Sequence, residues 1–498
     1  MKANTRAKKI IAGALIALLM TGLCACAGQA DDSVTEADNS AAATEYLTKE
    51  DITVNETFTD DSDGGHAIEV SGEEAEYANI GVTKTGEADG DEADFYGENS
   101  AVFATEKGTL TIKDSLIETN GTHANAVFSY GEGTTVSIAD SVIETQGNCS
   151  GGLMTTGGGT MNAENLTINT SGRSSAAIRS DRGGGTVTVT KGYYKTTGTG
   201  SPVIYSTADI TVNDAYMEST ASQGVVVEGK NSVTLNNDTL VADNNQKNSD
   251  KSEYYQAVMI YQSMSGDAAQ GEASFSMTDG TLTNKNGDVF FVNNTVATIN
   301  LSKADIVNED QTGVFLRAAA AGWGSEGSNG GHVTLKATDQ TVNGNMLVDD
   351  VSTLNLYLSE GSTFTGTINS DAAASDVYVE LAEGTKWVLT GDAHISSLTC
   401  AADCIDLNGH TLYVGDTAYT EGTESSGEAI EVTITSTGGP GEMGGEPPAK
   451  PDGEGGPQGA GGEPPAKPDG EGGSGQPPAK PDGEGGSGQP PAKPGSDS

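Results

Sequence analysis

The chain has 498 residues, with 71 acidic and 25 basic side chains and a formal net charge of −46 at pH 7. This charge excludes nucleic acid as a partner and disfavours electrostatic attraction to anionic lipid, whereas cations and neutral or basic ligands are compatible with it. Plain solubility explains the charge as well as a use of divalent ions does. Five cysteines in this length exclude a disulfide-rich scaffold.

Residues 1–25 are predicted to be a lipoprotein signal peptide. Positive side chains occupy residues 2–9, and residues 10–20 form an apolar stretch too short to span a membrane as a mature helix. The segment that follows resembles the lipobox of bacterial lipoproteins, Leu23-Cys24-Ala25-Cys26. This resemblance implies that Cys26 becomes the lipidated first residue, with Cys24 as the alternative. The protein is therefore expected to be exported and held on the cell membrane by a lipid anchor that faces the exterior.

Residues 26–65 are predicted to be a disordered tether, because they are acidic, rich in Ala, Thr and Ser, and poor in aromatic residues. At the other end, residues 441–498 repeat Pro-Pro-Ala-Lys-Pro between glycine-rich acidic segments. This composition predicts a disordered, extended Pro/Gly tail. Such a tail could contact the cell-wall polymer or be inert, and residues 416–440 are interpreted as an end cap or linker.

The segment between Ala101 and Asp243 repeats one short phrase of alternating apolar and Thr, Asn or Asp residues. The copies follow one another at roughly 23 to 26 residues, a step typical of stacked repeats, and begin at Leu110, Val136, Met161, Val187, Ile210 and Val233. Alternation of this kind is strand periodicity. The rhythm breaks after Asp243 and then resumes, so residues 66–415 are predicted to form one solenoid.

Coils of this length, with Gly, Asn, Asp and Thr at their corners and no helical stretch, resemble the right-handed parallel β-helix of pectin-lyase-like proteins. Residues 172–185 and 261–267 are more closely similar to segments of adhesin-like β-helix surface lipoproteins of monoderm bacteria. The resemblance implies an all-β solenoid at the cell surface, and it implies no particular reaction. A stack of antiparallel sandwich domains is the competing all-β arrangement, but it requires hairpin turns that the sequence lacks.

A second strand precedes the repeated phrase in each coil. If Val127, Leu153, Ile178 and Ile204 point inward, alternation also directs a hydroxyl ladder inward, Ser129, Thr155, Ser180 and Ser206. The position between them then forms an outer column that extends over roughly 40 Å at about 4.8 Å per coil. We predict this column to be Phe103, Phe128, Met154, Arg179, Tyr205, Glu228, Tyr261, Phe291 and Arg317.

The outer column is the candidate ligand-binding stripe, because aromatic faces stack on sugar rings and arginine grips carboxylates in two-point geometry. Alternatively, these side chains pack on one another between coils, or a register shift of one residue directs them inward. Insertions that follow this strand add candidate rim residues, Arg182, Trp323 and His332. Merely permissive insertions are an equal alternative.

The sequence singles out no catalytic residue. Hydrolysis of a glycosidic bond needs two facing carboxylates, and no such pair stands out. Arg173, Arg179, Asp181 and Arg182 are candidates for a lyase base and substrate clamp, and Asp89, Asp91 and Asp94 for ligands of a structural Ca²⁺. These two segments belong to different coils, so they are not expected to share a site.

Three cysteines lie beyond the anchor region. Cys400 and Cys404 are close enough in sequence to close a short disulfide loop, or they are two free thiols. Cys149 is interpreted as a small buried filler.

The sequence thus favours a lipid-anchored adhesin or a glycan- or protein-binding protein without catalysis. Its expected partners are an extracellular glycan or a host or matrix protein. The alternative is a polysaccharide lyase or glycoside hydrolase on the same scaffold, and the third interpretation is a structural surface spacer.

Overall fold

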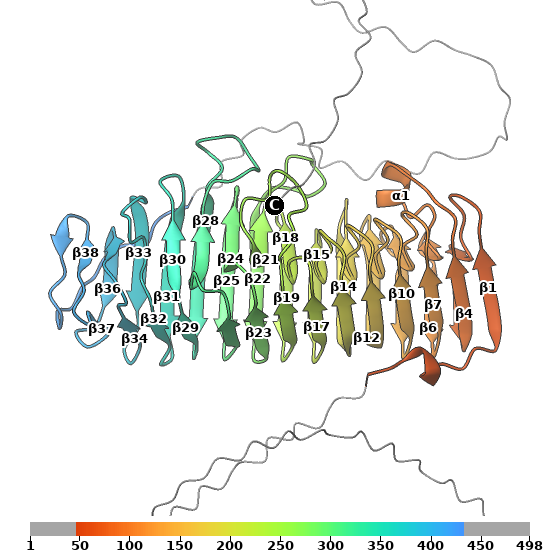
Figure 1. The fold of residues 1–498 in the computed structure, drawn as a ribbon, viewed down its shortest axis with the longest axis horizontal. Helices are drawn as coiled ribbons and strands as arrows, with labels where there is room; N and C mark the ends of the chain where they lie inside the picture. Colours follow the sequence, from red (N-terminus) through yellow and green to blue (C-terminus); the bar gives the residue numbers. More distant parts are fainter. Residues whose placement is uncertain (1–45, 433–498) are drawn as a thin grey trace, which may run out of the picture. The chain divides into compact units, whose positions relative to one another are not determined.

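A computed structural model describes residues 46–432. The predicted signal peptide, Cys26, most of the tether, residues 433–440 and the Pro/Gly tail lie outside the described residues. The described chain is a parallel β-helix, which confirms the predicted fold class (Figure 1). Strands of one coil pair in parallel with the equivalent strands of the next coil, and they form a 21-stranded sheet A and an 11-stranded sheet B.

Sheet B takes one strand from each coil. Its strands are β2 (Ile68–Ser71), β5 (Val102–Thr105), β8 (Val127–Tyr130), β11 (Leu153–Thr156), β13 (Ile178–Ser180), β15 (Ile204–Ser206), β18 (Val225–Glu228), β21 (Gln256–Tyr261), β24 (Asp288–Asn293), β27 (Val314–Ala318) and β30 (Asn345–Val348).

Sheet A takes the two remaining segments of most coils. Its strands are β1 (Glu56–Asp60), β3 (Glu74–Ala78), β4 (Ile80–Lys84), β6 (Thr109–Lys113), β7 (Leu116–Thr119), β9 (Thr135–Ala139), β10 (Val142–Thr145), β12 (Gly159–Thr170), β14 (Gly185–Thr196), β16 (Asp209–Asn213), β17 (Tyr216–Ser219), β19 (Ser232–Asn236), β20 (Thr239–Ala242), β22 (Glu272–Thr278), β23 (Thr281–Asn284), β25 (Thr295–Ser302), β26 (Asp305–Asn308), β28 (Gly331–Thr338), β31 (Thr353–Ser359), β33 (Asp376–Leu381) and β36 (Ser397–Cys400).

Two smaller sheets complete the C-terminal end. The four-stranded sheet contains β29 (Thr341–Asn343), β32 (Thr363–Thr365), β34 (Lys386–Val388) and β37 (Ile405–Asp406), and the three-stranded sheet contains β35 (Ala393–Ile395), β38 (Leu412–Val414) and β39 (Thr417–Ala418). The helical segments are η1 (Lys49–Asp51) and α1 (Asp91–Phe95).

The repeated segment contains the bend between the two strands that each coil contributes to sheet A. In each copy one residue takes a left-handed conformation, such as Asp114 with φ of 49° and Asp140 with φ of 48°. Asp and Asn tolerate this conformation better than other non-glycine residues, because their short polar side chains bond locally to the backbone. Apolar residues on both sides of the bend, such as Ile112 and Ile117, then point into the coil and are fully buried. One polar residue per repeat therefore turns the chain without interrupting the core.

The interior of the stack is the main hydrophobic core. Val127, Leu153, Ile178 and Ile204 belong to it, as predicted. The hydroxyl ladder beside them is also fully buried. Its three serines bond to backbone, as in the contact of Ser129 Oγ with the carbonyl of Thr160 at 3.0 Å, whereas the Thr155 hydroxyl has no hydrogen-bond partner among the described residues. Burial of each aliphatic side chain of this core contributes about 1.5–3 kcal/mol.

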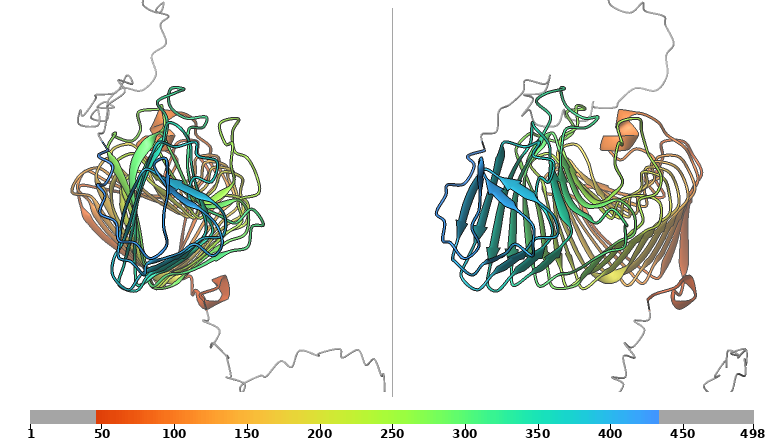
Figure 2. Two further views of the ribbon diagram at one scale, coloured as in Figure 1. Left: turned by 90° about the vertical axis from the view of Figure 1, so that its left-hand side faces the viewer. Right: turned by 60° about the vertical axis from the view of Figure 1, so that its left-hand side comes forward.

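The long connections enter or leave strands of sheet B. They are residues 85–101, which include α1, and residues 243–255, 262–271 and 319–330. Figures 1 and 2 show α1 and the loops near β18 to β28 projecting from the same side of the stack. The coils thus leave sheet A largely uncovered and concentrate their insertions beside sheet B.

The ordered chain begins earlier than predicted. β1 pairs with β4 in parallel, and Phe58 packs against the core, so the prediction of a disordered tether up to residue 65 was wrong for this part. Before β1, η1 lies on sheet A, where Lys49 pairs with Glu118 at 2.7 Å. Phe58 is the single apolar residue of Glu56–Asp60, so the segment carries little strand pattern within its acidic surroundings.

The end of the stack is covered by the chain after β38. β38 and β39 pair antiparallel, and Ser425 then bridges to Cys400. Cys400 and Cys404 are both free thiols in the structure, so the disulfide interpretation was wrong. Their sulfur atoms face different partners, because Cys400 contacts the Tyr419 hydroxyl at 3.8 Å whereas Cys404 donates to the carbonyl of Ala382 at 3.5 Å.

Candidate binding surface

The outer column of sheet B aligns largely as predicted. Phe103, Phe128, Met154, Arg179 and Tyr205 are paired one to the next across successive strands. The column continues through Val226 and Met259 to Phe291 and Arg317. The prediction that Glu228 and Tyr261 belong to this column was wrong by two residues. They pair with each other two residues farther along their strands, so they face the same side in the next row.

The prediction that this column is an open stripe was wrong. Its first part forms an apolar cluster that we call the N-terminal cluster, which contains Phe103, Phe128 and Met154 and lies outside the main core. Phe103 is 1% exposed, and Phe128 and Met154 are fully buried. The connection 85–101 covers them: Gly97 packs so closely on the Phe103 ring that a Cβ there would lie 2.4 Å from it. The phase of the alternation was right, but the chain's own connection hides the side chains.

The second part forms the C-terminal cluster, which is also separate from the core. It contains Val226, Met259, Tyr261, Phe291 and Ala319, with Tyr205, Tyr254, Ala321 and Trp323 packed against it. Trp323, a predicted rim residue, lies edge-on to Tyr261 with ring centroids 5.1 Å apart. His332 lies in β28 of sheet A and not at the rim, where its Nδ1 is 3.2 Å from the Thr353 hydroxyl.

Arg317 lies at the C-terminal end of the outer column, where its side chain contacts other residues of the chain. Its guanidinium binds both oxygens of Asp288, at 2.6 and 3.2 Å, and lies 4.1 Å above the centre of the Tyr254 ring. These contacts use the two-point geometry that we predicted for a ligand carboxylate. The partner is a residue of the chain itself.

A charged network separates the two clusters. Arg179 pairs with Asp181 at 2.7 Å and lies 4.0 Å from Asp94 of α1. Arg182 pairs with Asp267 at 2.8 Å and with Asp91 at 3.5 Å. The expectation that Asp89–Asp94 and Arg179–Arg182 lie too many coils apart to share a site was therefore wrong. The connection 85–101 crosses several strands of sheet B, which coil counting could not reveal.

Arg182 joins two parts of the cover over sheet B. Its guanidinium also stacks on Phe95 of α1, 3.8 Å from the ring centre, while Asp267 belongs to the loop 262–271. A single side chain in the turn after β13 therefore holds α1 and this loop together.

Burial and the neighbouring charges both shift the pKa values of the groups in this network. It raises the pKa of Asp181 to about 6, although Arg179 acts in the opposite direction. Burial opposes the charge of Arg179, but Asp181 and Asp94 outweigh it and raise the pKa of the guanidinium. The charges of this network are thus matched within the molecule.

A buried carboxylate sits beside the network. Glu228 is 1% exposed, and its Oε2 accepts hydrogen bonds from the hydroxyls of Tyr205 and Tyr261, the latter at 3.0 Å. Its other oxygen has no hydrogen-bond partner among the described residues. Burial and the neighbouring Glu228 charge raise the pKa of both tyrosines well above the usual value.

Asp181 and Glu228 follow the inward residues Ile178 and Val225 by three positions, and these strands are two coils apart. This alignment of carboxylates was missed from the sequence. The repeat alignment contained it, but only the structure shows which of the many acidic residues are buried.

The predicted calcium ligands do not form a cation site. Asp91 and Asp94 pair with Arg182 and His123, and the pKa of Asp94 is lowered because His123 and Arg179 outweigh its burial. Asp89 is exposed and does not join them. Within residues 46–432, no three Asp, Glu, His or Cys side chains converge in a way that could hold a metal ion.

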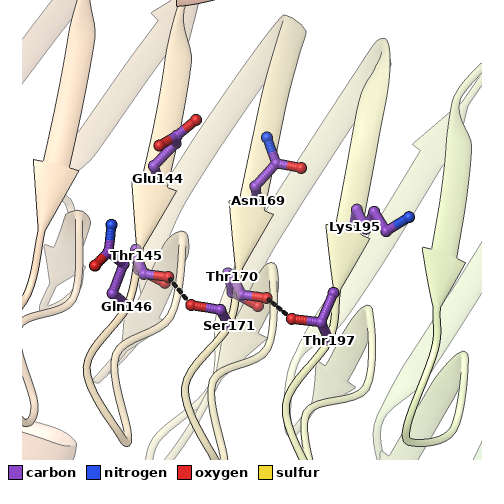
Figure 3. A pocket seen from close by; sticks show the side chains of 8 residues that line it. All are labelled: Glu144, Thr145, Gln146, Asn169, Thr170, Ser171, Lys195 and Thr197. Atoms are coloured by element: carbon purple, nitrogen blue, oxygen red, sulfur yellow. Dashed lines mark hydrogen bonds between the residues drawn. The ribbon is translucent and has the colours of Figure 1, made fainter.

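Sheet A carries a separate feature, a shallow hollow of about 210 Å³ beside its strand ends (Figure 3). Glu144, Asn169 and Lys195 from successive coils line one side of it. Nearby, Tyr193 and Tyr216 are stacked with centroids 5.4 Å apart, and Tyr46 lies 4.9 Å from Tyr193. Half-exposed aromatic and polar side chains thus meet on this face as well.

Comparisons of the chain with protein-family models, with curated proteins and with solved structures found no match. In the described part of the chain, neither η1 nor α1 has the length and apolar character needed to cross a membrane.

Proposed function

We propose that this protein is a non-catalytic, adhesin-like binding protein of the cell surface, anchored by lipid at Cys26, that recognises an extracellular glycan or protein. The observation that carries the proposal is the gathering of the long connections beside sheet B, where they pack into one continuous cover. Rigid scaffolds place recognition on such loops, because the scaffold fixes where the loops begin and end.

The loops of this cover have fixed bases and exposed tips. Arg182 holds Asp267, and Gln262 donates to the carbonyl of Ala268 at 3.2 Å within the loop 262–271. In the loop 319–330, Asn329 donates to the carbonyls of Ala321 and Trp323 at 2.7 and 2.8 Å. The exposed tips are residues 264–266 and 325–328. Bases held in this way reduce the conformational entropy that a loop loses on binding.

The composition of the tips favours neutral partners. They combine serine and glycine with Met264, which is 50% exposed, and with Glu326. Small hydroxyl-bearing residues adapt their hydrogen bonds, while an exposed methionine offers apolar contact. Together with the strongly acidic chain, this favours neutral glycans or protein surfaces over polyanions.

Binding of the purified full chain to immobilised neutral and acidic glycans and to matrix proteins tests the proposal. The double variant Met264→Ser, Glu326→Ala removes tip contacts without touching a buried side chain. We expect it to weaken binding by about ten-fold or more, since contacts at the centre of a recognition surface carry about 1–2 kcal/mol each. The matched control on sheet A, Tyr193→Ala with Tyr216→Ala, should bind normally.

Two results would contradict the proposal. Retention by no ligand of the panel would favour a structural spacer, an interpretation that the covered outer column also supports. Loss of binding only in the Tyr193 and Tyr216 variant would move the binding site to the hollow of sheet A.

A polysaccharide hydrolase or lyase is the second candidate, and the carboxylates Asp181 and Glu228 are the observation that favours it. The two carboxylates are two coils apart, which corresponds to about 10 Å between their strands at the usual strand spacing. This distance is near the separation of about 6.5–9.5 Å between the two carboxyl groups of inverting glycosidases. Against it, Asp181 is 5% exposed and paired, and Glu228 is bound by two tyrosines. If the protein cleaves a polysaccharide, and if the variants Asp181→Asn and Glu228→Gln each abolish that cleavage, the protein is an enzyme.

A further inference from the structure

A thiol, an imidazole and a carboxylate meet under the edge of α1. His123 Nδ1 lies 3.1 Å from Asp94 Oδ1, and Cys149 of the next coil is near enough to the imidazole to contribute to its raised pKa. An imidazole held between a carboxylate and a thiol is the arrangement by which proteins activate a cysteine nucleophile. This group has no part in the binding surface proposed above.

The repeat builds this arrangement from two adjacent coils. His123 and Cys149 occupy the same corner position, with φ of 56° and 55°. Their backbones continue in register, since the His123 amide donates to the carbonyl of Asn148 at 2.9 Å and the Cys149 amide to that of Arg173 at 2.8 Å. The side chains are therefore held about one strand spacing apart. Asp94 reaches them because α1 folds over sheet B.

The interaction with Asp94, reinforced by Cys149, raises the pKa of His123 to about 10 and so keeps the ring charged at neutral pH. The other charged groups that face this site come from the neighbouring coils. Arg179 lies 4.0 Å from Asp94, and Arg182 adds positive charge beyond it. Both arginines are paired with aspartates, so the charged group beside the thiol is the His123 imidazolium. A cysteine next to a charged imidazole is a typical setting for a reactive thiol.

Two further observations indicate that the site is accessible and incomplete. Cys149 is half-buried and not sealed in the core, so its interpretation as a buried filler was wrong. Asn125 spans the same two coils, and its Oδ1 accepts a hydrogen bond at 2.8 Å from the amide of Gly151, close to Cys149 in sequence. Its Nδ2 has no hydrogen-bond partner among the described residues, although the residue is 1% exposed. A buried amide donor without a partner is costly, and a bound polar molecule would satisfy it.

We propose that Cys149 is a nucleophilic thiol, activated by His123 and Asp94, that undergoes exchange with small polar disulfides. The Cys149 thiolate attacks one sulfur atom of the disulfide, a new sulfur–sulfur bond to Cys149 forms, and the original bond breaks. The departing thiolate takes the proton that His123 or water supplies. The product is a mixed disulfide on the protein and one free small thiol.

The rate of mixed-disulfide formation with oxidised glutathione at pH 6, followed for each cysteine by peptide mass spectrometry, tests this proposal on the purified full chain. We expect Cys149 in the folded protein to react about ten-fold faster or more than the same cysteine in the urea-unfolded chain, where an ordinary thiol is almost wholly protonated. Cys400 and Cys404, which are buried, serve as unreactive internal references.

Variants of the neighbouring residues distinguish a Cys149 thiol that His123 and Asp94 activate from one that is merely exposed. His123→Gln and Asp94→Asn should each reduce the folded rate toward that of the unfolded chain. Asp91→Asn, on the same helix but paired with Arg182, should leave it within about two-fold. Cys149→Ser copies the serine of the next coil, Ser174, and should abolish labelling in a folded protein. Circular dichroism verifies that each variant is folded.

A folded rate no higher than the unfolded rate would overturn the proposal. The same holds if the folded variants His123→Gln and Asp94→Asn both react as fast as the original chain.

Discussion

The outer faces of the two sheets carry the same alternating sequence pattern but have different surroundings. On sheet A the outward side chains are mostly short and polar, remain half-exposed and bond along the stack, as Asn236 does with Asn213 at 3.0 Å. On sheet B the outward side chains are large or charged, and the connections beside the sheet bury them. The period of two decides which way a side chain points, and the connections decide whether it meets solvent.

The two faces of the scaffold can therefore serve different roles. A bare face of short side chains tolerates change and keeps the coils soluble. A covered face links distant coils, because Arg182 and Asp94 join segments that are far apart in sequence. The exposed positions for recognition then lie on the cover and not on the sheet beneath it.

The largest effect is expected where a covered aromatic is removed. Phe128→Ala should lower the free energy of unfolding by about 3–5 kcal/mol, because it leaves a cavity between Phe103 and Met154 under residues 85–101. Tyr193→Ala on sheet A should cost about 0.5–1.5 kcal/mol, the value of one aromatic stacking contact. Urea denaturation followed by circular dichroism measures both. Equal costs would break the distinction between the two faces.

Loosening the cover should have a smaller but localised effect. Arg182→Gln removes the ion pairs with Asp267 and Asp91, and we expect a loss of about 1–3 kcal/mol. Hydrogen exchange should increase in residues 85–101 and 262–271 and remain unchanged in the strands of sheet A. Uniform exchange along the whole stack would contradict the bridging role of Arg182.

The His123–Asp94 pair predicts a pH-dependent contribution. The folded pKa of His123 is raised to about 10, so the stabilisation is complete below the ordinary histidine pKa of about 6.5 and is lost as the pH rises through 10. His123→Gln should therefore cost about 1–2 kcal/mol at pH 6 and almost nothing above pH 10. Thermal unfolding of both proteins across this range measures the difference, and a cost that is constant with pH would show that His123 acts only through packing.

The smallest effect is expected on the bare face. Lys49 pairs with Glu118 and Glu144 where η1 lies on sheet A, and its side chain is 36% exposed. Lys49→Ala should change the free energy of unfolding by less than about 1 kcal/mol, and the change should vanish in high salt. Urea denaturation at low and high ionic strength provides the comparison. A large, salt-independent loss would mean that η1 is as firmly attached as the cover of sheet B.

The fold could be predicted from the sequence because its cause is local and repeated. Alternation fixed the inward residues Val127 and Ile178, and a left-handed Asp or Asn in most repeats marked the bend. The identity of the outer column followed from the same alternation as far as Tyr205 and resumed at Phe291.

The candidate site could be predicted only in part, because it depends on contacts between irregular segments. Periodicity cannot show that residues 85–101 reach Arg179 and Arg182, or that Gly97 packs on Phe103. His123 and Cys149 share a repeat position, which a more careful alignment of the corners would have found. Asp94, their third member, comes from an insertion without any repeat partner.

Methionine oxidation tests most directly whether the connections cover sheet B. Met154 is fully buried and Met259 is 3% exposed in the two outer clusters, whereas Met264 on the loop 262–271 is 50% exposed. In dilute hydrogen peroxide, peptide mass spectrometry should find Met264 oxidised rapidly and Met154 and Met259 protected until the protein unfolds. Oxidation of Met154 and Met259 in the folded protein at the rate of Met264 would show that the column is open to solvent and would contradict this account.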